Sequence, residues 1–382
     1  MVLAVGTAAQ ASVSAVFLGV AVLAPQLRAQ YGLTLGQVGV LLAATSVGMT
    51  PTLLLWGLLA DRVGERIVLP VGLVAAAIVL APAGFASGYF GLVALLVAAG
   101  AFGASVNAAS GRAVMHWFPR SERGFALGIR QANVPIGGLF AALALPALAS
   151  WKGLGAAFVA LAVALAFGAL AGLVLLRDPV SAVAPRRVPS RPLRDGSVWR
   201  LSWGSGLLMV GQMATMSFTV IFLHAARGFS PGAAAAVLAA QQVLGAALRV
   251  LAGLWSDRLG VRIAPMRRLA IAISTTLFLV SLLSAGSRWL LVPALVIAGG
   301  VGLSWNGLSF TAAAEIAGAT ASGAAIGLQQ TVLGICGIVI PIGFSTAVSH
   351  SSWRVAFIAA ALFPLLGWAL LRPLAAGRAT SL

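Results

Sequence analysis

Two arginines, Arg130 and Arg249, lie within long apolar stretches of this sequence. Arg249 precedes Asp257 by eight residues and Arg130 follows Arg123 by seven, so each lies about 10–12 Å along a helix from a charged end. A guanidinium group presents a planar fork of donors that matches a carboxylate or a similar small anion. Because ionisable residues inside apolar segments are functional candidates, these two positions predict a binding site for an anion.

Each arginine has a structural alternative, which is to bond backbone carbonyls or to pair with a carboxylate on another segment. Acidic partners are scarce, and we expect none of them in the middle of an apolar segment. A buried charge in a bilayer needs a partner or water, so a substrate anion is a candidate partner. The seven acids of the chain are Asp61, Glu65, Glu122, Asp178, Asp195, Asp257 and Glu315.

Amide side chains recur near these arginines and are candidates for the same site. Gln242 and Gly245 share one helix face with Arg249, and Asn133 shares another with Arg130. Interhelical hydrogen bonding is the alternative role for such amides, and both readings stay open. The candidate substrate-binding residues are Arg130, Arg249, Gln131, Asn107, Asn306, Gln242, Gln329 and Gln330, and further polar residues that we place in spans are Gln10, Ser12, Ser14 and Gln212.

The composition shows which kind of element must position these residues. Of 382 residues, 60% are hydrophobic and 8% are charged, whereas soluble domains carry roughly 25% charged residues. The apolar runs are continuous and long enough for bilayer helices. Their number predicts an all-α membrane protein with twelve transmembrane helices. The predicted spans are residues 7–25, 36–60, 67–86, 90–111, 124–149, 154–176, 198–225, 231–254, 269–285, 289–311, 323–349 and 355–371.

The distribution of basic residues predicts the orientation. The net charge of +17 does not indicate nucleic-acid binding, because the arginines cluster in alternate loops as the positive-inside rule requires. With both termini inside, sixteen basic residues fall on the inner side and five on the outer side. We therefore expect a multi-pass protein of the cytoplasmic (inner) membrane with both termini in the cytoplasm.

Internal repeats divide the chain. The segment from Gly57 to Gly64 recurs from Gly253 to Gly260, 196 residues later, and Gly103 to Asn107 recurs as Gly302 to Asn306, 199 residues later. Two more matches have similar offsets. A duplicated six-helix unit is the parallel-repeat plan of a secondary transporter. We expect a bundle over residues 1–176, a cytoplasmic linker over 177–197 and a second bundle over 198–382.

The repeated loop carries a resemblance to a known family. Gly57-x-x-x-Asp61-Arg62-x-Gly64-x-Arg66, between the second and third spans, resembles the signature loop of the major facilitator superfamily, from which Glu65 and Val261 depart. The resemblance covers essentially the whole chain and implies two pseudo-symmetric six-helix bundles. We expect the residues of this loop and of its second copy to control the change of conformation. We also expect Gly57 and Gly253 to let two helices approach closely. The gating candidates are Gly57, Asp61, Arg62, Gly64, Arg66, Gly253, Asp257 and Arg258.

These observations predict a secondary transporter, not an enzyme, that moves a small anion or carboxylate-bearing solute by alternating access. The stretch from Gly128 to Gln131 and the Arg249-to-Asp257 spacing resemble the cyanate, nitroimidazole and nitrate-type permeases. The alternative is proton-coupled efflux of a drug or metabolite, because Val134 to Gly138 resembles the antiporter motif of efflux members. We expect a monomer that contacts the lipid bilayer and a small solute, with protons as a candidate coupling ion and no cofactor, metal or nucleic acid.

Overall fold

The described chain is built from helices. A computed structural model describes residues 2–117, 133–175, 195–317 and 322–376. All regular secondary structure within these ranges is helical, which confirms the predicted all-α class. The long helices follow the apolar stretches because a segment in a bilayer must satisfy its backbone hydrogen bonds internally.

The chain divides into two compact units, Met1–Ala184 with Ser217–Ala239 and Pro185–Met216 with Ala240–Leu382. The division expected from the repeats, at residues 177–197, stays a prediction. The helices that end before residue 176 are α1 (Val2–Tyr31), α2 (Leu35–Val63), α3 (Glu65–Leu80), the 3₁₀ helix η1 (Ala81–Phe85), α4 (Tyr89–Trp117) and α6 (Asn133–Leu175). From residue 195 onward come α7 (Gly196–Met216), α8 (Thr219–Arg227), α9 (Pro231–Leu259), α10 (Ile263–Leu283), α11 (Arg288–Leu303), α12 (Asn306–Ala317), α13 (Ser322–His350), α14 (Trp353–Leu370) and α15 (Arg372–Ala376).

In the first unit, glycines let α2 and α4 pack backbone to backbone. A Cβ atom at Gly100 of α4 would overlap the backbone of Thr45 in α2, and one at Gly48 would overlap the backbone of Val97. Two side chains of α2 bridge the same interface, since Thr52 Oγ1 and Trp56 Nε1 donate to the carbonyl oxygen of Ala101 at 3.0 and 2.7 Å. This contact needs small residues at the crossing, as membrane helix pairs commonly do.

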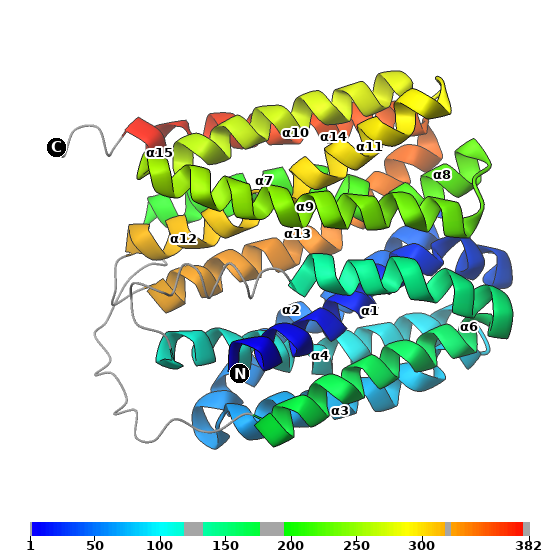
Figure 1. Ribbon diagram of the computed structural model, residues 1–382, viewed down its shortest axis with the longest axis horizontal. Coiled ribbons are helices and arrows are strands. Elements are labelled where there is room, and N and C mark those ends of the chain that lie inside the picture. The colour runs from blue at the N-terminus through cyan, green and yellow to red at the C-terminus, as the bar shows by residue number, and fades with distance from the viewer. Residues whose placement is uncertain (1, 118–132, 176–194, 318–321, 377–382) are drawn as a thin grey trace. The chain divides into compact units, whose positions relative to one another are not determined.

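Helix α6 is bent into two segments at Gly153, whose φ of 79° is in the left-handed region. Glycine adopts this conformation without the penalty that a Cβ imposes. The predicted spans 124–149 and 154–176 meet at this break, as far as their residues are described. Helix α1 packs against α6, and α3 packs against both α4 and α6 (Figure 1).

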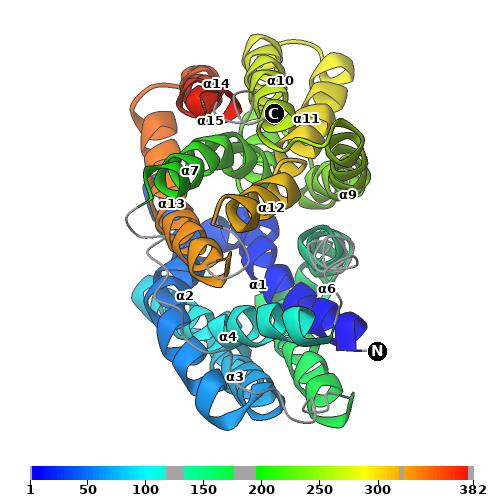
Figure 2. The ribbon, with the colours of Figure 1, turned by 90° about the vertical axis from the view of Figure 1, so that its left-hand side faces the viewer.

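In the second unit, α14 packs against both α7 and α10, and Figure 2 shows it next to these two helices. Ser274 of α10 donates to the carbonyl oxygen of Ala361 in α14 at 2.7 Å. Gly367 of α14 faces α7, where a Cβ would lie 3.0 Å from the carbonyl oxygen of Gly204. Trp305 and Phe357 are among the largest completely buried side chains of this unit.

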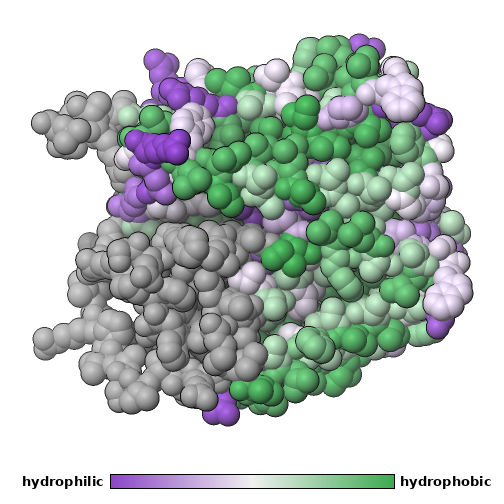
Figure 3. Space-filling view, in the orientation of Figure 1, coloured by the Kyte–Doolittle hydropathy of each residue, from purple (hydrophilic) through white to green (hydrophobic). Residues whose placement is uncertain are grey.

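Large apolar side chains cover much of the outer surface. Phe167 is 73% exposed on α6, Val250 and Leu251 are 62% and 57% exposed on α9, and Ile78 is 67% exposed on α3. The face drawn in Figure 3 is largely hydrophobic over its described residues. Such a surface is unfavourable in water and suits the hydrocarbon core of a bilayer.

The number of spans differs from the prediction of twelve. Nine described helices are long and apolar enough to cross a membrane, or ten when α7 and α8, which are bent by 45°, form one span. Part of the difference lies in α6, which counts once with 42 residues, although about 63 Å of helix is twice the thickness of a hydrocarbon core of about 30 Å. The all-α membrane class is therefore confirmed, and the count of twelve is not.

We predict that Gly100→Val destabilises the protein, because the valine side chain would meet the backbone of α2. Overpacking of this kind typically costs about 1–3 kcal/mol. Gly91→Val is the matched control on the same helix, where the nearest contact of a Cβ is an ordinary 3.9 Å. The melting temperature in detergent should fall clearly for Gly100→Val and little for Gly91→Val. Equal melting temperatures would show that α2 and α4 do not pack in this way.

Candidate functional site

The structure describes some of the predicted binding residues and leaves others out. Arg130 and Gln131 lie outside the described residues, and Asn107 lies in α4 with its side chain outside the description. The predicted proximity of Arg130 and Arg249 therefore stays a prediction. Arg249, Gln242, Asn306, Gln329 and Gln330 all lie in described helices of the second unit.

Arg249 is buried in α9, with 7% of its surface exposed. Its Nε and Nη2 atoms donate to the carbonyl oxygen of Leu303 at 3.1 and 3.0 Å. Leu303 is the last residue of α11, and α12 begins only at Asn306, so the helix is interrupted next to this carbonyl. One expected structural role of Arg249, bonding to a backbone carbonyl, is thus present in the structure.

An amide pair joins the same interruption to α7. Asn306 Nδ2 donates to Gln212 Oε1 at 3.0 Å and lies 3.4 Å from the carbonyl oxygen of Leu303. Gly302 allows this approach, because a Cβ there would already lie 3.3 Å from the Cα of Gln212. Gln212, Arg249, Leu303 and Asn306 together form what we call the break cluster, in which the helices α7, α9, α11 and α12 of the second unit meet. Of the four, only Leu303 could not have been predicted as a site residue from the sequence, because its side chain is apolar and it contributes its backbone carbonyl.

Gln242 lies seven residues before Arg249 on α9 and is completely buried. Neither its amide nitrogen nor its amide oxygen has a hydrogen-bond partner among the described residues. Leaving a buried polar group unpaired costs about 1–3 kcal/mol. The spacing places Gln242 on the same helix face as Arg249, so this face presents an amide that still requires a partner.

Gln329 belongs to a separate buried cluster with two serines. Its Nε2 atom donates to Ser309 Oγ of α12 and, at 3.3 Å, to Ser205 Oγ of α7. The two hydroxyl groups also bond to each other. All three side chains are completely buried, so interhelical bonding, the alternative role of this amide, is present. The sequence did not single out Ser205 or Ser309, because serines recur throughout the apolar segments. Gln330 is half-buried on the neighbouring face of α13.

In the first unit, Asn133 also bonds between helices. Its Nδ2 donates to Gln10 Oε1 at 3.1 Å, and its Oδ1 accepts from Ser14 Oγ at 2.8 Å. Gly137, one turn along α6, leaves no room for a Cβ against the backbone of α1 near Ala11. The side of α6 that carries Asn133 and Gly137 therefore faces α1.

For the first signature loop, residues 57–66, the structure describes the backbone and only some of the side chains. Gly64 separates α2 from α3 with a φ of 85°, and its N–H donates to the carbonyl oxygen of Ala60 at 3.1 Å. Arg66 is exposed. The side chains of Asp61 and Arg62, and the surroundings of Gly57, lie outside the description, so their gating role stays a prediction.

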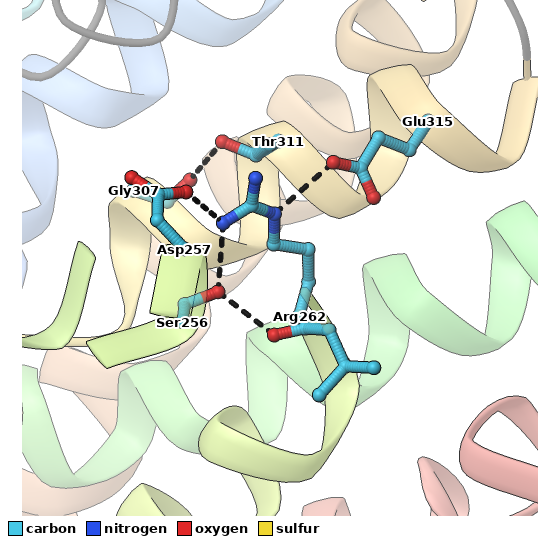
Figure 4. A network of polar contacts seen from close by, with 7 residues as sticks. Ser256, Asp257, Arg262, Gly307, Thr311 and Glu315 are labelled. Atoms are coloured by element: carbon cyan, nitrogen blue, oxygen red, sulfur yellow. Dashed lines mark hydrogen bonds and ion pairs between the residues drawn. The ribbon is translucent and has the colours of Figure 1, made fainter. Parts of the chain in front are cut away.

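The second signature loop is centred on Arg262, as Figure 4 shows. Arg262 Nη1 donates to Asp257 Oδ1 and, at 2.9 Å, to Ser256 Oγ, and Nε donates to Glu315 Oε1 at 3.0 Å. Ser256 Oγ donates in turn to the carbonyl oxygen of Val261 at 2.8 Å. Partial burial lowers the pKa of Arg262, but its bonds to Asp257 and Glu315 outweigh burial, so the pKa is raised above its ordinary value. This ion-pair network connects the end of α9, the start of α10 and the end of α12.

The arginine that pairs with Asp257 is Arg262, whereas the gating candidate Arg258 is exposed, because neighbouring residues of a helix do not face each other. No described atom lies within 4 Å of the position of a Cβ at Gly253, so the close helix approach expected there stays a prediction. Glu315, a member of the network, was missed because it lies 53 residues from Arg262 in the sequence.

We predict that Arg262→Gln lowers the melting temperature in lipid-free detergent at low salt, because it leaves Asp257 and Glu315 without their common counter-charge. Since the network is partly exposed, the loss should be modest, about 1 kcal/mol, and should shrink near 1 M salt, where the Debye length is about 3 Å. Arg258→Gln is the control, because Arg258 is exposed and forms no ion pair among the described residues. Equal melting temperatures for the two variants at low salt would contradict a stabilising role for the network.

The sequence matches one family over most of its length. Residues 4–341 match the sequence model of the Major Facilitator Superfamily. An uncharacterized MFS-type transporter of Mycobacterium tuberculosis is 34% identical over 354 residues, which cover 91% of this chain and 79% of that protein. A probable sulfoacetate transporter of Cupriavidus necator is 27% identical over 367 residues, which cover 87% of this chain and 83% of that protein.

The fold matches solved transporter structures. A bacterial homolog of the human lysosomal transporter Spinster, in an inward-facing and unoccupied conformation, aligns over 97% of this chain and 95% of its own with a TM-score of 0.79. The sequence identity of 16% makes this a likeness of fold alone. The match over residues 4–341 and the relative that is 34% identical show that the chain belongs to the Major Facilitator Superfamily and is a membrane transporter rather than an enzyme.

Proposed function

We propose that this protein is a secondary transporter that moves a small organic anion, carrying a carboxylate or a sulfonate, by alternating access. The observation that carries the proposal is the buried guanidinium of Arg249 beside an interrupted helix, with the unpaired amide of Gln242 on the same helix face. A guanidinium and an amide nitrogen are the donors that such an anion needs. The relative described as a probable sulfoacetate transporter supports this class of substrate.

The position of Arg249 supports an anion as the ligand. Its guanidinium bonds the carbonyl oxygen of Leu303 through two nitrogens, which fixes the group beside the interrupted helix. Interrupted helices within a membrane line cavities in many transporters, where the freed backbone groups contribute to binding. An arginine already fixed at such a place would lose little side-chain entropy when an anion binds.

The described acids favour an anion over a cationic drug. Asp257 and Glu315 are both ion-paired with Arg262, and Asp195 Oδ1 accepts a hydrogen bond from the N–H of Ser197 at the start of α7. An exporter of cations is expected to use a carboxylate inside the membrane. Among the acids whose side chains the structure describes, each is engaged near a helix end, so none of these three is placed for that task.

We predict that Arg249→Gln abolishes most anion binding and that Arg249→Lys restores little of it, because lysine lacks the planar fork. Binding of sulfoacetate and of other small carboxylates to purified protein is measured by thermal shift, and uptake by proteoliposomes. Arg28→Gln is the matched control, since Arg28 Nε also donates to a backbone carbonyl, that of Leu33, at 3.1 Å but near a helix end. The control should keep both activities.

Two outcomes would overturn the anion assignment. One is normal anion uptake by Arg249→Gln; the other is a cation as the preferred ligand, with uptake that survives both Arg249 variants, which would favour proton-coupled efflux. If Arg249→Gln does not fold, Gln242→Leu carries the test. Leucine removes the unpaired amide without leaving a buried polar group, so the variant should fold well and bind the anion several-fold more weakly.

We further propose that the protein works as a monomer in the cytoplasmic membrane with both termini in the cytoplasm, and that protons are a candidate coupling ion. The orientation rests on the excess of basic residues in alternate loops. A reporter enzyme active only in the cytoplasm should be active when fused after Leu382 or inserted between Arg186 and Arg194. Activity of a periplasmic reporter at either place would reverse the orientation.

A further inference from the structure

Arginines and tryptophans gather at one end of the second unit, where α9 ends, α10 begins and α14 leads into α15. Figure 3 shows hydrophilic residues at that end of these helices, next to a largely hydrophobic surface. We call this group the Arg–Trp cluster, and it consists of Trp255, Arg258, Arg267, Arg268, Trp368 and Arg372.

Direct contacts join four of the six cluster residues across three helices. Arg267 Nε of α10 donates to the carbonyl oxygen of Trp368 in α14 at 3.2 Å, and its guanidinium carbon lies 4.6 Å from the centroid of the Trp368 ring. The guanidinium carbon of Arg268 lies 5.4 Å from the Trp255 ring of α9. Both distances are within the range of cation–π attraction, so the rings restrict where the positive charges lie.

Among the described side chains, no carboxylate is ion-paired with an arginine of the cluster. The described acids closest in sequence, Asp257 and Glu315, are both bound by Arg262. No ion pair of Arg258, Arg267, Arg268 or Arg372 occurs among the described residues. Three of these arginines, Arg258, Arg268 and Arg372, are exposed, so the end of the unit presents several unneutralised cations.

An apolar surface adjoins these charges on the same helix faces. On α9, Leu251 and Leu254 are 57% and 50% exposed and precede Arg258 by seven and four residues. On α10, Ile271 is 44% exposed and follows Arg268 by three residues. Residues at these spacings share a helix face. Cations at the helix end and apolar side chains next to them match the headgroup and the acyl chain of a lipid.

We propose that the Arg–Trp cluster binds the headgroup of an anionic phospholipid, whose acyl chain lies along the exposed apolar residues of α9 and α10. Tryptophan favours the headgroup level of a bilayer, where its ring is apolar and its N–H is polar. A phosphate group takes hydrogen bonds from guanidinium groups in bidentate geometry. The adjoining apolar surface favours a lipid over free phosphate, because free phosphate would leave that surface unused.

The test compares an anionic with a zwitterionic lipid on the full-length, delipidated protein in a neutral detergent. Phosphatidylglycerol and phosphatidylcholine are added separately, and binding is measured by native mass spectrometry and by the shift in melting temperature. Phosphatidylglycerol should bind and stabilise the protein, and phosphatidylcholine should do so much less. In the double variant Arg258→Gln/Arg268→Gln, phosphatidylglycerol should bind about 25-fold more weakly, since each basic residue near a membrane surface contributes on the order of a fivefold factor.

The matched control is Arg288→Gln/Arg354→Gln, which removes two exposed arginines from the opposite ends of the helices, at the starts of α11 and α14. This control should keep the affinity for phosphatidylglycerol. If the first double variant does not fold, the single variant Arg258→Gln replaces it with an expected fivefold loss, because Arg258 is exposed at the end of its helix.

Three results would overturn the proposal. The first is equal stabilisation by phosphatidylcholine and phosphatidylglycerol. The second is an unchanged affinity for phosphatidylglycerol in the cluster variant, or an equal loss in the control. The third is full reproduction of the stabilisation by inorganic phosphate alone, which would identify an anion site without a lipid.

Discussion

A carbonyl released from a helix inside a membrane must find another donor, because lipid offers none. At the end of α11 the carbonyl is that of Leu303, and the donor is Arg249, which bonds to it through two nitrogens. The amide pair of Asn306 and Gln212 lies at the same place. The interruption between α11 and α12 is therefore tolerated because polar side chains from two other helices reach it.

The same constraint explains where the other polar groups of the described helices lie. Buried serines and amides bond across helices, as in the contacts of Gln329 with Ser205 and Ser309. Charged groups that bond to each other, such as Arg262 with Asp257 and Glu315, lie where helices end. Arg249 is the charged side chain that the described part of the chain buries most deeply, which is why its role matters most for function.

Much of the fold was predictable from the sequence, because it depends on the period and length of apolar segments and on repeated loops. The helical class and the helix ends near Gly64 and Gly260 follow from these local signals. The interruption after Leu303 was not predictable, since the segment from Gly299 to Trp305 contains no proline or charge that marks a helix end. The pairing of Asp257 and Glu315 with Arg262 was not predictable either, because it depends on how α9, α10 and α12 pack.

Helix α12 has polar contacts close to both of its ends. Its first residue adjoins the carbonyl that Arg249 binds, and Glu315 near its last residue is bound by Arg262. With 12 residues, α12 is about 18 Å long. This length is similar to the distance along α9 from Arg249 to Asp257, about 12 Å, plus the turn that leads from α9 to Arg262. Its link to α11, by contrast, is a two-residue interruption without a continuous ladder of hydrogen bonds. Arg249 therefore binds the last carbonyl of α11, and Arg262 binds a carboxylate near the end of α12, so both arginines act on the one stretch Arg288–Ala317.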